Sequence, residues 1–263
     1  MRAFLRTYVQ KRRAANEPFS GNEFNLLSIF FGAPELFTDE VIVDTMMTLL
    51  FAPIMTDKTS QTLVSHLATA PESLEKLRSE FQSTVTDELA GAKDRLRKFV
   101  TYENLQEMGY LAQVVMETLR FQTSNPTSTA ATLERDSKIG KFQLKAGDVI
   151  YVNLQGLHRH RAQWQRPFEF LPERFDPASP LALARDGSKR RAMAYLPFMA
   201  GKRACFGKTV AELILKTVAL YMSQYFEMEL VEKVKYPDTH TLPVTQIATT
   251  YYPHVEMRLR LRA

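Results

Sequence analysis

The sequence contains little cysteine and no long hydrophobic run, and each shortage excludes a class of protein. One cysteine among 263 residues excludes an intramolecular disulfide, so a reducing, intracellular compartment is expected. The most apolar stretch, VIVDTMMTLLFAPIM at 41–55, contains Asp44 and Pro53 and is too short to span a bilayer. No signal-like segment follows Met1. The sequence as given therefore predicts a cytoplasmic chain without a membrane anchor.

The composition is that of an ordinary globular protein. Hydrophobic residues make up 45% of the chain and charged residues 24%, and the formal net charge is +5. The basic residues are scattered, and neither a nucleic-acid-binding module nor an internal repeat is present. The length allows one large domain or two small ones, and the charge favours a partner with an acidic surface over nucleic acid.

Hydrophobic periodicity predicts mostly helices. Residues 1–15 have helical spacing, and residues 38–70 indicate one long helix with Thr38 as N-cap. This helix is apolar almost all round, which predicts burial on all sides. Pro53 lies inside it and is expected to kink or open it near 51–55.

The rest of the chain predicts more helices and a few short strands. Further helices are expected at 71–89, 103–121 and 205–226. The second of these has a stripe predicted to be buried, formed by Leu105, Met108, Leu111, Val115, Thr118 and Leu119. Short strands are expected within 140–158, 244–252 and 254–262, and a long irregular segment within 158–197. The expected fold class is mainly α with small β-sheets (α+β).

The lone cysteine lies in PFMAGKRACFGK at 197–208. Gly201 and Gly207 allow positive φ and close approach of a flat ligand, and the helix after Cys205 directs its positive end toward the sulfur. Together with Arg203, this environment favours a thiolate. From the residues alone, Cys205 is a buried inert thiol, a nucleophile or a ligand. No histidine is close in sequence to support the nucleophile.

The ten residues FMAGKRACFG match Phe-x-x-Gly-x-Arg-x-Cys-x-Gly, which resembles the haem-binding signature of the cytochrome P450 family. The matching positions are Phe198, Gly201, Arg203, Cys205 and Gly207. The resemblance implies a haem-ligand loop at about 196–207 that binds haem b (iron protoporphyrin IX), with Cys205 as the proximal thiolate ligand of the iron. It also implies that Arg203 contacts a haem propionate and that Phe198 shields the sulfur.

Two more segments resemble the family. ETLR at 117–120 resembles its Glu-x-x-Arg, and WQRPFEFLPERF at 164–175 resembles the segment whose arginine completes a structural cluster with that pair. The resemblance implies that this cluster consists of Glu117, Arg120 and Arg174. NLQGLHRH at 153–160 resembles the preceding segment, and we interpret His158 as structural. A metal site at HRH is the alternative, and it requires further ligands.

The long helix departs from the family pattern, and two registers compete. The preferred register aligns 52–56 with the family's oxygen-binding motif and makes Thr56 the candidate catalytic alcohol on the oxygen side, with Pro53 in place of a glycine and Met55 in place of an acid. The other register puts Lys58 at the threonine position. The arginine that the family usually offers to a propionate near 131–135 stays unassigned.

The resemblance runs from about Thr38, or from Met1, to the C-terminus, whereas family members are commonly near twice this length. It implies the C-terminal, helix-rich half of a cytochrome P450-like fold. The N-terminal half would hold any membrane anchor, so a longer form with such an anchor is expected at the endoplasmic-reticulum membrane. It would also hold most of the substrate pocket.

The leading hypothesis is a haem-thiolate monooxygenase, or half of one, that inserts one oxygen atom of O2 into an apolar organic substrate. A reductase is expected to dock on the basic face around Lys202, Arg203 and Lys208. One alternative is a haem-thiolate isomerase or dehydratase, or an inactive haem binder. Another is a helical interaction fragment without haem.

Overall fold

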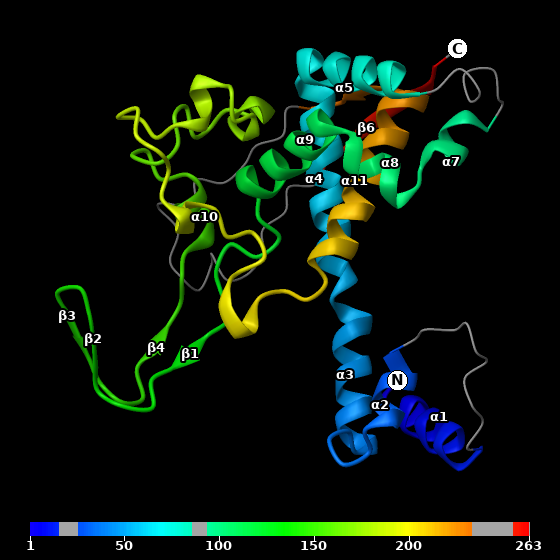
Figure 1. Cartoon of the computed structure of the whole chain (residues 1–263), viewed down its shortest axis with the longest axis vertical. Coiled ribbons are helices and arrows are strands. Elements are labelled where there is room, and N and C mark those ends of the chain that lie inside the picture. Colours follow the sequence, from blue (N-terminus) through cyan, green and yellow to red (C-terminus); the bar gives the residue numbers. More distant parts are fainter. Residues whose placement is uncertain (16–25, 86–93, 233–254, 263) are drawn as a thin grey trace. The chain divides into compact units, whose positions relative to one another are not determined.

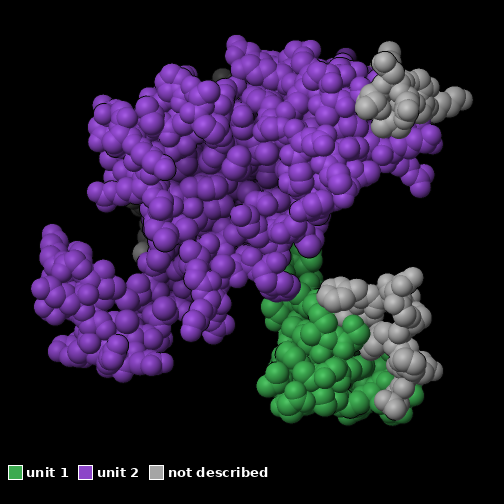
Figure 2. All heavy atoms as spheres, in the orientation of Figure 1, with its two compact units in different colours: residues 1–54 green, residues 55–263 purple. Residues whose placement is uncertain are grey.

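The computed structural model describes residues 1–15, 26–85, 94–232 and 255–262. The chain divides into two compact units, residues 1–54 and 55–263 (Figure 2). The helices of the first unit are α1 (Arg2–Ala15), α2 (Leu26–Gly32) and α3 (Asp39–Phe51). At the boundary begins α4 (Pro53–Thr69), and the later helices are α5 (Pro71–Thr84), α7 (Arg95–Phe99), α8 (Tyr102–Glu107), α9 (Gly109–Phe121), α10 (Leu154–His158) and α11 (Lys208–Tyr225) (Figure 1).

In the first unit, α1 covers one face of α3. Their shared core contains Leu5, Val9 and Ile42, and Arg6 of α1 binds the Glu40 carboxylate with an Nε–Oε1 distance of 2.6 Å. The expected burial of this helix on all sides is wrong, because α3 also carries exposed apolar side chains, with Phe51 58% exposed. The apolar side chains of α3 are buried only where another helix covers them, and α1 covers one side of α3.

The long helix predicted at 38–70 begins as expected and is interrupted where expected. The Thr38 hydroxyl accepts a hydrogen bond from the Val41 N–H, which caps α3. The helix divides at Ala52, which keeps helical dihedral angles and donates its N–H to the Thr48 carbonyl at 2.9 Å. Pro53 then occupies the first position of α4, where its missing N–H is tolerated. The predicted interruption near Pro53 is confirmed.

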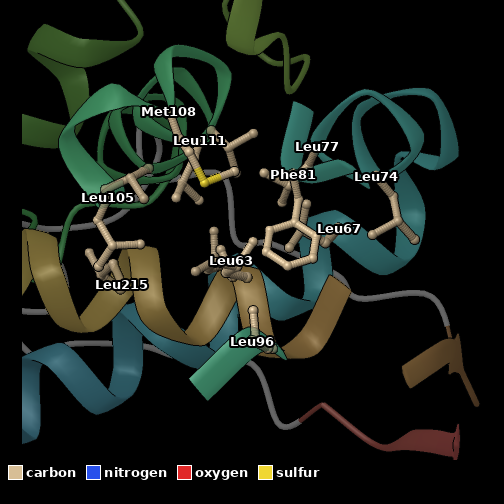
Figure 3. Packing of buried hydrophobic residues seen from close by; sticks show 14 of the residues in the cluster. Leu63, Leu67, Leu74, Leu77, Phe81, Leu96, Leu105, Met108, Leu111 and Leu215 are labelled. Carbon is tan, nitrogen blue, oxygen red and sulfur yellow. The ribbon is translucent and has the colours of Figure 1, made fainter. Parts of the chain in front are cut away.

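The second unit is organised around α4, α5, α9 and α11, whose apolar faces meet in one core (Figure 3). Leu63, Leu77, Leu111 and Leu215 contribute one fully buried side chain from each of these helices. The predicted stripe from Leu105 to Leu119 is buried throughout. The predicted helix at 103–121, however, is divided into α8 and α9.

A carboxylate from another helix explains this division. Glu80 of α5 accepts the N–H of Tyr110 at 2.6 Å and that of Leu111 at 2.8 Å, so it satisfies the first donors of α9. Met108, between the two helices, has extended backbone angles. The break therefore depends on a tertiary contact that periodicity within 103–121 does not encode.

Within the described ranges, the strands form three two-stranded antiparallel sheets. β1 (Ala131–Thr132) pairs with β4 (Val149–Ile150), β2 (Ser137–Ile139) with β3 (Phe142–Leu144), and β5 (Phe226–Leu230) with β6 (Met257–Leu261). Gly140, with φ +58°, makes the turn between β2 and β3. The strand expected at 244–252 lies outside the described residues.

The predicted irregular segment at 158–197 contains short 3-10 helices at Pro172–Phe175, Pro180–Ala182 and Ala192–Ala194, and one isolated β-bridge between Leu183 and Lys189. Another 3-10 helix, Gly201–Arg203, precedes Cys205. None of the helices in the described part of the chain is both long enough and apolar enough to cross a membrane.

Candidate functional site

Cys205 lies exposed on a closed loop directly before α11. Its N–H donates to the Phe198 carbonyl at 2.8 Å, which closes the loop over residues 198–205. Two residues in this loop have positive φ, Met199 at 63° and Gly201 at 75°. Positive φ is uncommon for a side chain such as that of methionine, so the surrounding contacts must hold this conformation in place.

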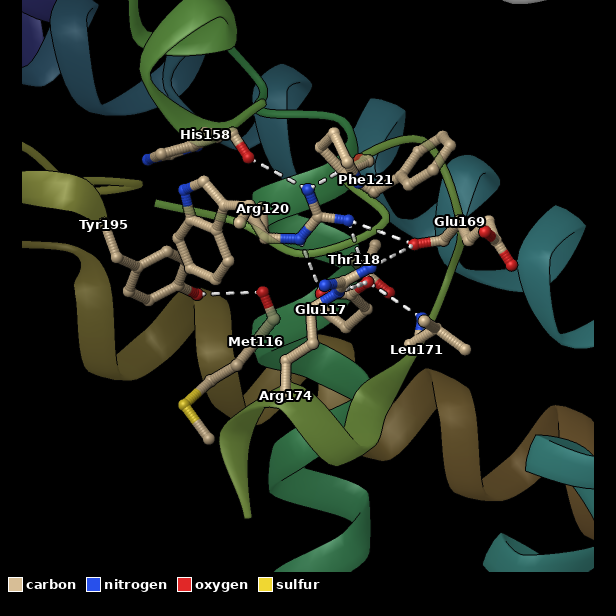
Figure 4. Close-up of polar contacts among 12 residues, drawn as sticks. Met116, Glu117, Thr118, Arg120, Phe121, His158, Glu169, Leu171, Arg174 and Tyr195 are labelled. Carbon is tan, nitrogen blue, oxygen red and sulfur yellow. Dashed lines mark hydrogen bonds and ion pairs between the residues drawn. The ribbon is translucent and has the colours of Figure 1, made fainter. Parts of the chain in front are cut away.

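The start of the loop is attached to the helical core at three points. The Tyr195 hydroxyl donates to the Met116 carbonyl of α9 at 2.9 Å (Figure 4). The Leu196 N–H donates to Nε2 of His158 at 2.8 Å. The half-buried Phe198 side chain packs against the main hydrophobic core. One end of the loop is therefore anchored in the interior, while the thiol at its other end is exposed.

A buried cluster of charged residues lies beside these anchors (Figure 4). Glu117 and Arg120 of α9 form a bidentate pair with N–O distances of 2.7 and 2.8 Å, and Arg174 Nε lies 3.1 Å from Glu117 Oε1. All three side chains are fully buried. The same carboxylate accepts the Leu171 N–H at 2.8 Å. The structure thus brings together the three residues that the sequence pattern predicted as a cluster.

The two arginines use their remaining donors on main-chain carbonyls of the irregular segment. Arg120 donates to the carbonyls of His158 and Pro167, each at 2.9 Å. Arg174 donates to the carbonyls of Gln165 and Arg166. Because these carbonyls have no helix or sheet to pair with, the guanidinium groups replace secondary structure in holding the segment.

Aromatic side chains complete this region, and the sequence patterns did not predict their contacts. The Arg190 guanidinium lies 4.2 Å from the ring centre of the buried Trp164. Tyr195 packs against His158 and Phe175, with ring centres 5.3 and 5.0 Å apart. A single sequence carries no signal for these contacts, because the partners are joined only by the folded irregular segment.

Burial determines the charge states of the region. It lowers the pKa of Arg174 to about 10 despite the opposing effect of the Glu117 carboxylate, so Arg174 stays protonated at neutral pH. Burial, aided by the positive charges of Arg120 and Arg159, lowers the pKa of His158 to about 3. Burial also raises the pKa of Tyr195. His158 is therefore a neutral acceptor.

Thr56 lies in the first turns of α4 and is half-buried. Several hydroxyls of this helix donate to carbonyls one turn earlier, among them Thr59 to Met55 and Ser60 to Thr56. Thr56 makes no such bond within the described part of the chain. Asp57 is exposed and accepts from the Gln61 side chain at 3.1 Å.

The sequence patterns missed the buried hydroxyl in this part of α4. Thr59 is 1% exposed, and its hydroxyl lies 2.6 Å from that of Ser124, in the segment after α9. The only signal for this contact is a threonine-rich helix face, which does not identify a partner 65 residues away.

The residues around Cys205 fit a haem group. The single thiol is an exposed, soft donor of the type that haem iron accepts as a thiolate. Arg203 is exposed and makes no ion pair with any described residue, so its guanidinium is available to a propionate. A Cβ added to Gly207 would lie 3.7 Å from the Cys205 sulfur, and Phe206 beside it is 77% exposed. An exposed thiol, an exposed guanidinium and an exposed phenyl ring together suit a flat, largely apolar ligand that carries anionic groups.

Across the described ranges, no group of three or more histidine, cysteine, aspartate or glutamate side chains is placed to hold a metal ion. His158, the first histidine of HRH, is buried and accepts a backbone hydrogen bond instead.

Comparison with known proteins identifies related chains. The family model of cytochrome P450 matches residues 1–254. A curated relative, (+)-piperitol/(+)-sesamin synthase CYP81Q2 of Sesamum radiatum, is 31% identical and is matched over 78% of this chain and 37% of its own length. Isoflavone 2'-hydroxylase of Glycyrrhiza echinata is 28% identical, with coverages of 87% and 42%. The chain spans about two fifths of the length of these relatives.

The fold is also similar to that of a solved cytochrome P450 structure. A solved structure of a cytochrome P450 (CYP102L1) superposes with a TM-score of 0.78 at 24% sequence identity, covering 100% of this chain and 56% of that one. The predicted fold class is therefore confirmed.

We expect Glu117→Gln to destabilise the protein strongly, because it leaves two buried guanidinium groups without a counter-charge. The expected loss in the free energy of unfolding is about 3–5 kcal/mol. Glu169→Gln is the control, because the Glu169 side chain is 51% exposed and forms a surface ion pair with Arg166. Urea unfolding compares the two variants, and equal small losses would contradict the role given to the Glu117 carboxylate.

Proposed function

The chain belongs to the cytochrome P450 family, and from that premise we propose that it is the haem-binding part of a haem-thiolate monooxygenase with Cys205 as the iron ligand. Haem is the cofactor of this family, and oxidoreductase chemistry with O2, a substrate and a redox partner is its general activity. The observation that carries the proposal is the exposed Cys205 thiol on a loop whose start is hydrogen-bonded to α9 and to His158, beside a buried charged cluster. The haem-ligand loop at 196–207 and the treatment of residues 1–263 as one haem domain are parts of this proposal.

Bound haem would supply the activation of O2, and the residues of this chain would bind and orient it. Cys205 would give its thiolate to the iron, and the hydrogen bond from its N–H to Phe198 holds the sulfur in position. Arg203 would pair with a propionate. Gly201 and Gly207 keep the loop free of side chains where a flat group approaches.

The proposed substrate is an apolar small organic molecule. Among the relatives, one is a synthase of (+)-piperitol and (+)-sesamin, one is an isoflavone hydroxylase, and one is a steroid 17-alpha-hydroxylase/17,20 lyase. Each of these names refers to a multi-ring organic compound as substrate or product. The names therefore support an apolar organic substrate for this chain without identifying a particular compound.

A haem-thiolate isomerase or dehydratase, or an inactive haem binder, is the second candidate. It is favoured by the segment at 52–56, where Met55 stands in place of an acid and the nearest carboxylate, Asp57, is exposed on the helix surface. An interaction fragment without haem is the third candidate.

We expect the reduced protein, reconstituted with haem, to give a thiolate-type Soret band in a carbon-monoxide difference spectrum. Cys205→Ser should lose that band because an alcohol is a poor ligand for haem iron. A spectrum that is the same in both proteins would contradict ligation by Cys205. A band together with reductase-dependent substrate oxidation favours the monooxygenase, and a band without it favours the second candidate.

We propose Thr56 as the alcohol that delivers protons on the oxygen side. Thr56→Ala should lower the amount of product formed per electron consumed and raise peroxide release, because a positioned hydroxyl assists proton transfer. Thr56→Ser keeps the hydroxyl and is the matched control. Equal ratios of product to peroxide in the wild type and Thr56→Ala would remove this role.

We propose that the reductase docks on Lys202, Arg203 and Lys208, which are all exposed. Reduction should slow by about tenfold as salt rises from roughly 0.01 to 0.1 M, because salt screens a charge-steered encounter. Lys202→Glu should slow reduction at low salt, whereas Lys141→Glu, the same charge change at the turn between β2 and β3, should leave it unchanged. A reduction rate that does not depend on salt would exclude this surface.

A further inference from the structure

His158 lies at the end of α10 and connects two parts of the molecule that the sequence keeps apart. Its side chain is fully buried. Its carbonyl accepts a hydrogen bond from Arg120 of the charged cluster at 2.9 Å, and its ring lies against Tyr195 at 5.3 Å. Its position is therefore set from two sides.

The imidazole of His158 is the acceptor for the first backbone donor of the haem-ligand loop. The Leu196 N–H donates to Nε2 at 2.8 Å across 38 residues of sequence. Because Nε2 accepts, the proton of the neutral ring lies on Nδ1. Nδ1 is buried and has no hydrogen-bond partner among the described residues.

Two backbone hydrogen bonds connect Leu196 to the backbone of Cys205. The Leu196 carbonyl accepts the N–H of Met199 at 3.2 Å, in the turn where Met199 takes positive φ. The Phe198 carbonyl, inside that turn, accepts the N–H of Cys205 at 2.8 Å. The peptide group of Leu196 therefore helps to set the turn that orients the Phe198 carbonyl, and through it the cysteine backbone.

We propose that His158 is a positioning residue for Cys205, whose Nε2 acceptor fixes the Leu196 end of the loop and so keeps the thiolate on the iron. The iron-dependent part of this statement rests on the proposed function. Burial and the neighbouring charges of Arg120 and Arg159 keep the pKa of His158 low, which keeps Nε2 available as an acceptor at neutral pH.

The test compares His158→Phe with His158→Gln in the full chain. Phenylalanine keeps a ring against Tyr195 but has no acceptor, whereas a glutamine amide oxygen can occupy the place of Nε2. Without haem, exchange of the Leu196 amide hydrogen should be about tenfold faster in His158→Phe and close to wild type in His158→Gln. Tenfold corresponds to ~1.4 kcal/mol, the size expected for one hydrogen bond.

With haem, the thiolate-type carbon-monoxide band should be lost about tenfold faster in His158→Phe and at the wild-type rate in His158→Gln. Leu77→Ala is the control, because it removes a fully buried side chain of α5 and none of the hydrogen bonds that hold the loop. The comparison requires that Leu77→Ala and His158→Phe lower the thermal midpoint of unfolding by the same amount. If Leu77→Ala then loses the band as fast as His158→Phe, His158 acts through stability alone and the proposal is overturned.

The two readouts separate this proposal from the proposed function. Absence of a thiolate band in the wild type contradicts haem ligation, while unchanged Leu196 exchange in His158→Phe contradicts the role of His158. If His158→Phe does not fold, His158→Asn replaces it, because the shorter asparagine side chain does not reach the Leu196 N–H. Exchange of the Leu196 amide hydrogen in that variant then tests the role of His158 in the same way.

Discussion

The buried carboxylate of Glu117, between the guanidinium groups of Arg120 and Arg174, is the interaction on which the rest of the second unit depends. Three charges without access to water are tolerated only when each is paired and its other donors are used. The arginines satisfy this condition by donating to main-chain carbonyls of a segment with little secondary structure of its own. The cluster therefore gives the chain between His158 and Arg174 a defined path, and His158 and Tyr195 extend that order to the loop of Cys205.

The loop itself contains local strain that its anchors offset. Met199 and Gly201 both have positive φ, and a non-glycine residue in that region adds a cost of about 1–3 kcal/mol. The strain coincides with the turn that presents the thiol to the exterior. Such outliers are common where a ligand must be approached closely, and here the neighbouring glycines leave the sulfur accessible. A rigid interior anchor and an open thiol are what a loop needs to hold a large, flat ligand.

Much of this arrangement was predictable from sequence, and the parts that were not share one cause. The resemblance to the family's cysteine signature indicated the loop around Cys205, and the resemblance of ETLR to its Glu-x-x-Arg indicated the pair of Glu117 and Arg120, which the helix spacing of three allows. The family and the fold class are confirmed. Patterns within a segment, by contrast, did not show that Glu80 ends one helix and begins another, that Nε2 of His158 accepts from Leu196, or that one side of α3 is uncovered. Each of these depends on a partner distant in sequence.

The central claim is that this chain binds haem iron through Cys205, which the buried cluster keeps in place. X-ray absorption at the iron edge of the haem-loaded protein tests it most directly, because it detects the ligand atoms themselves. The account predicts one sulfur ligand at the iron in the wild type and none in Cys205→Ser. An iron surrounded only by nitrogen and oxygen in the wild-type protein would contradict it.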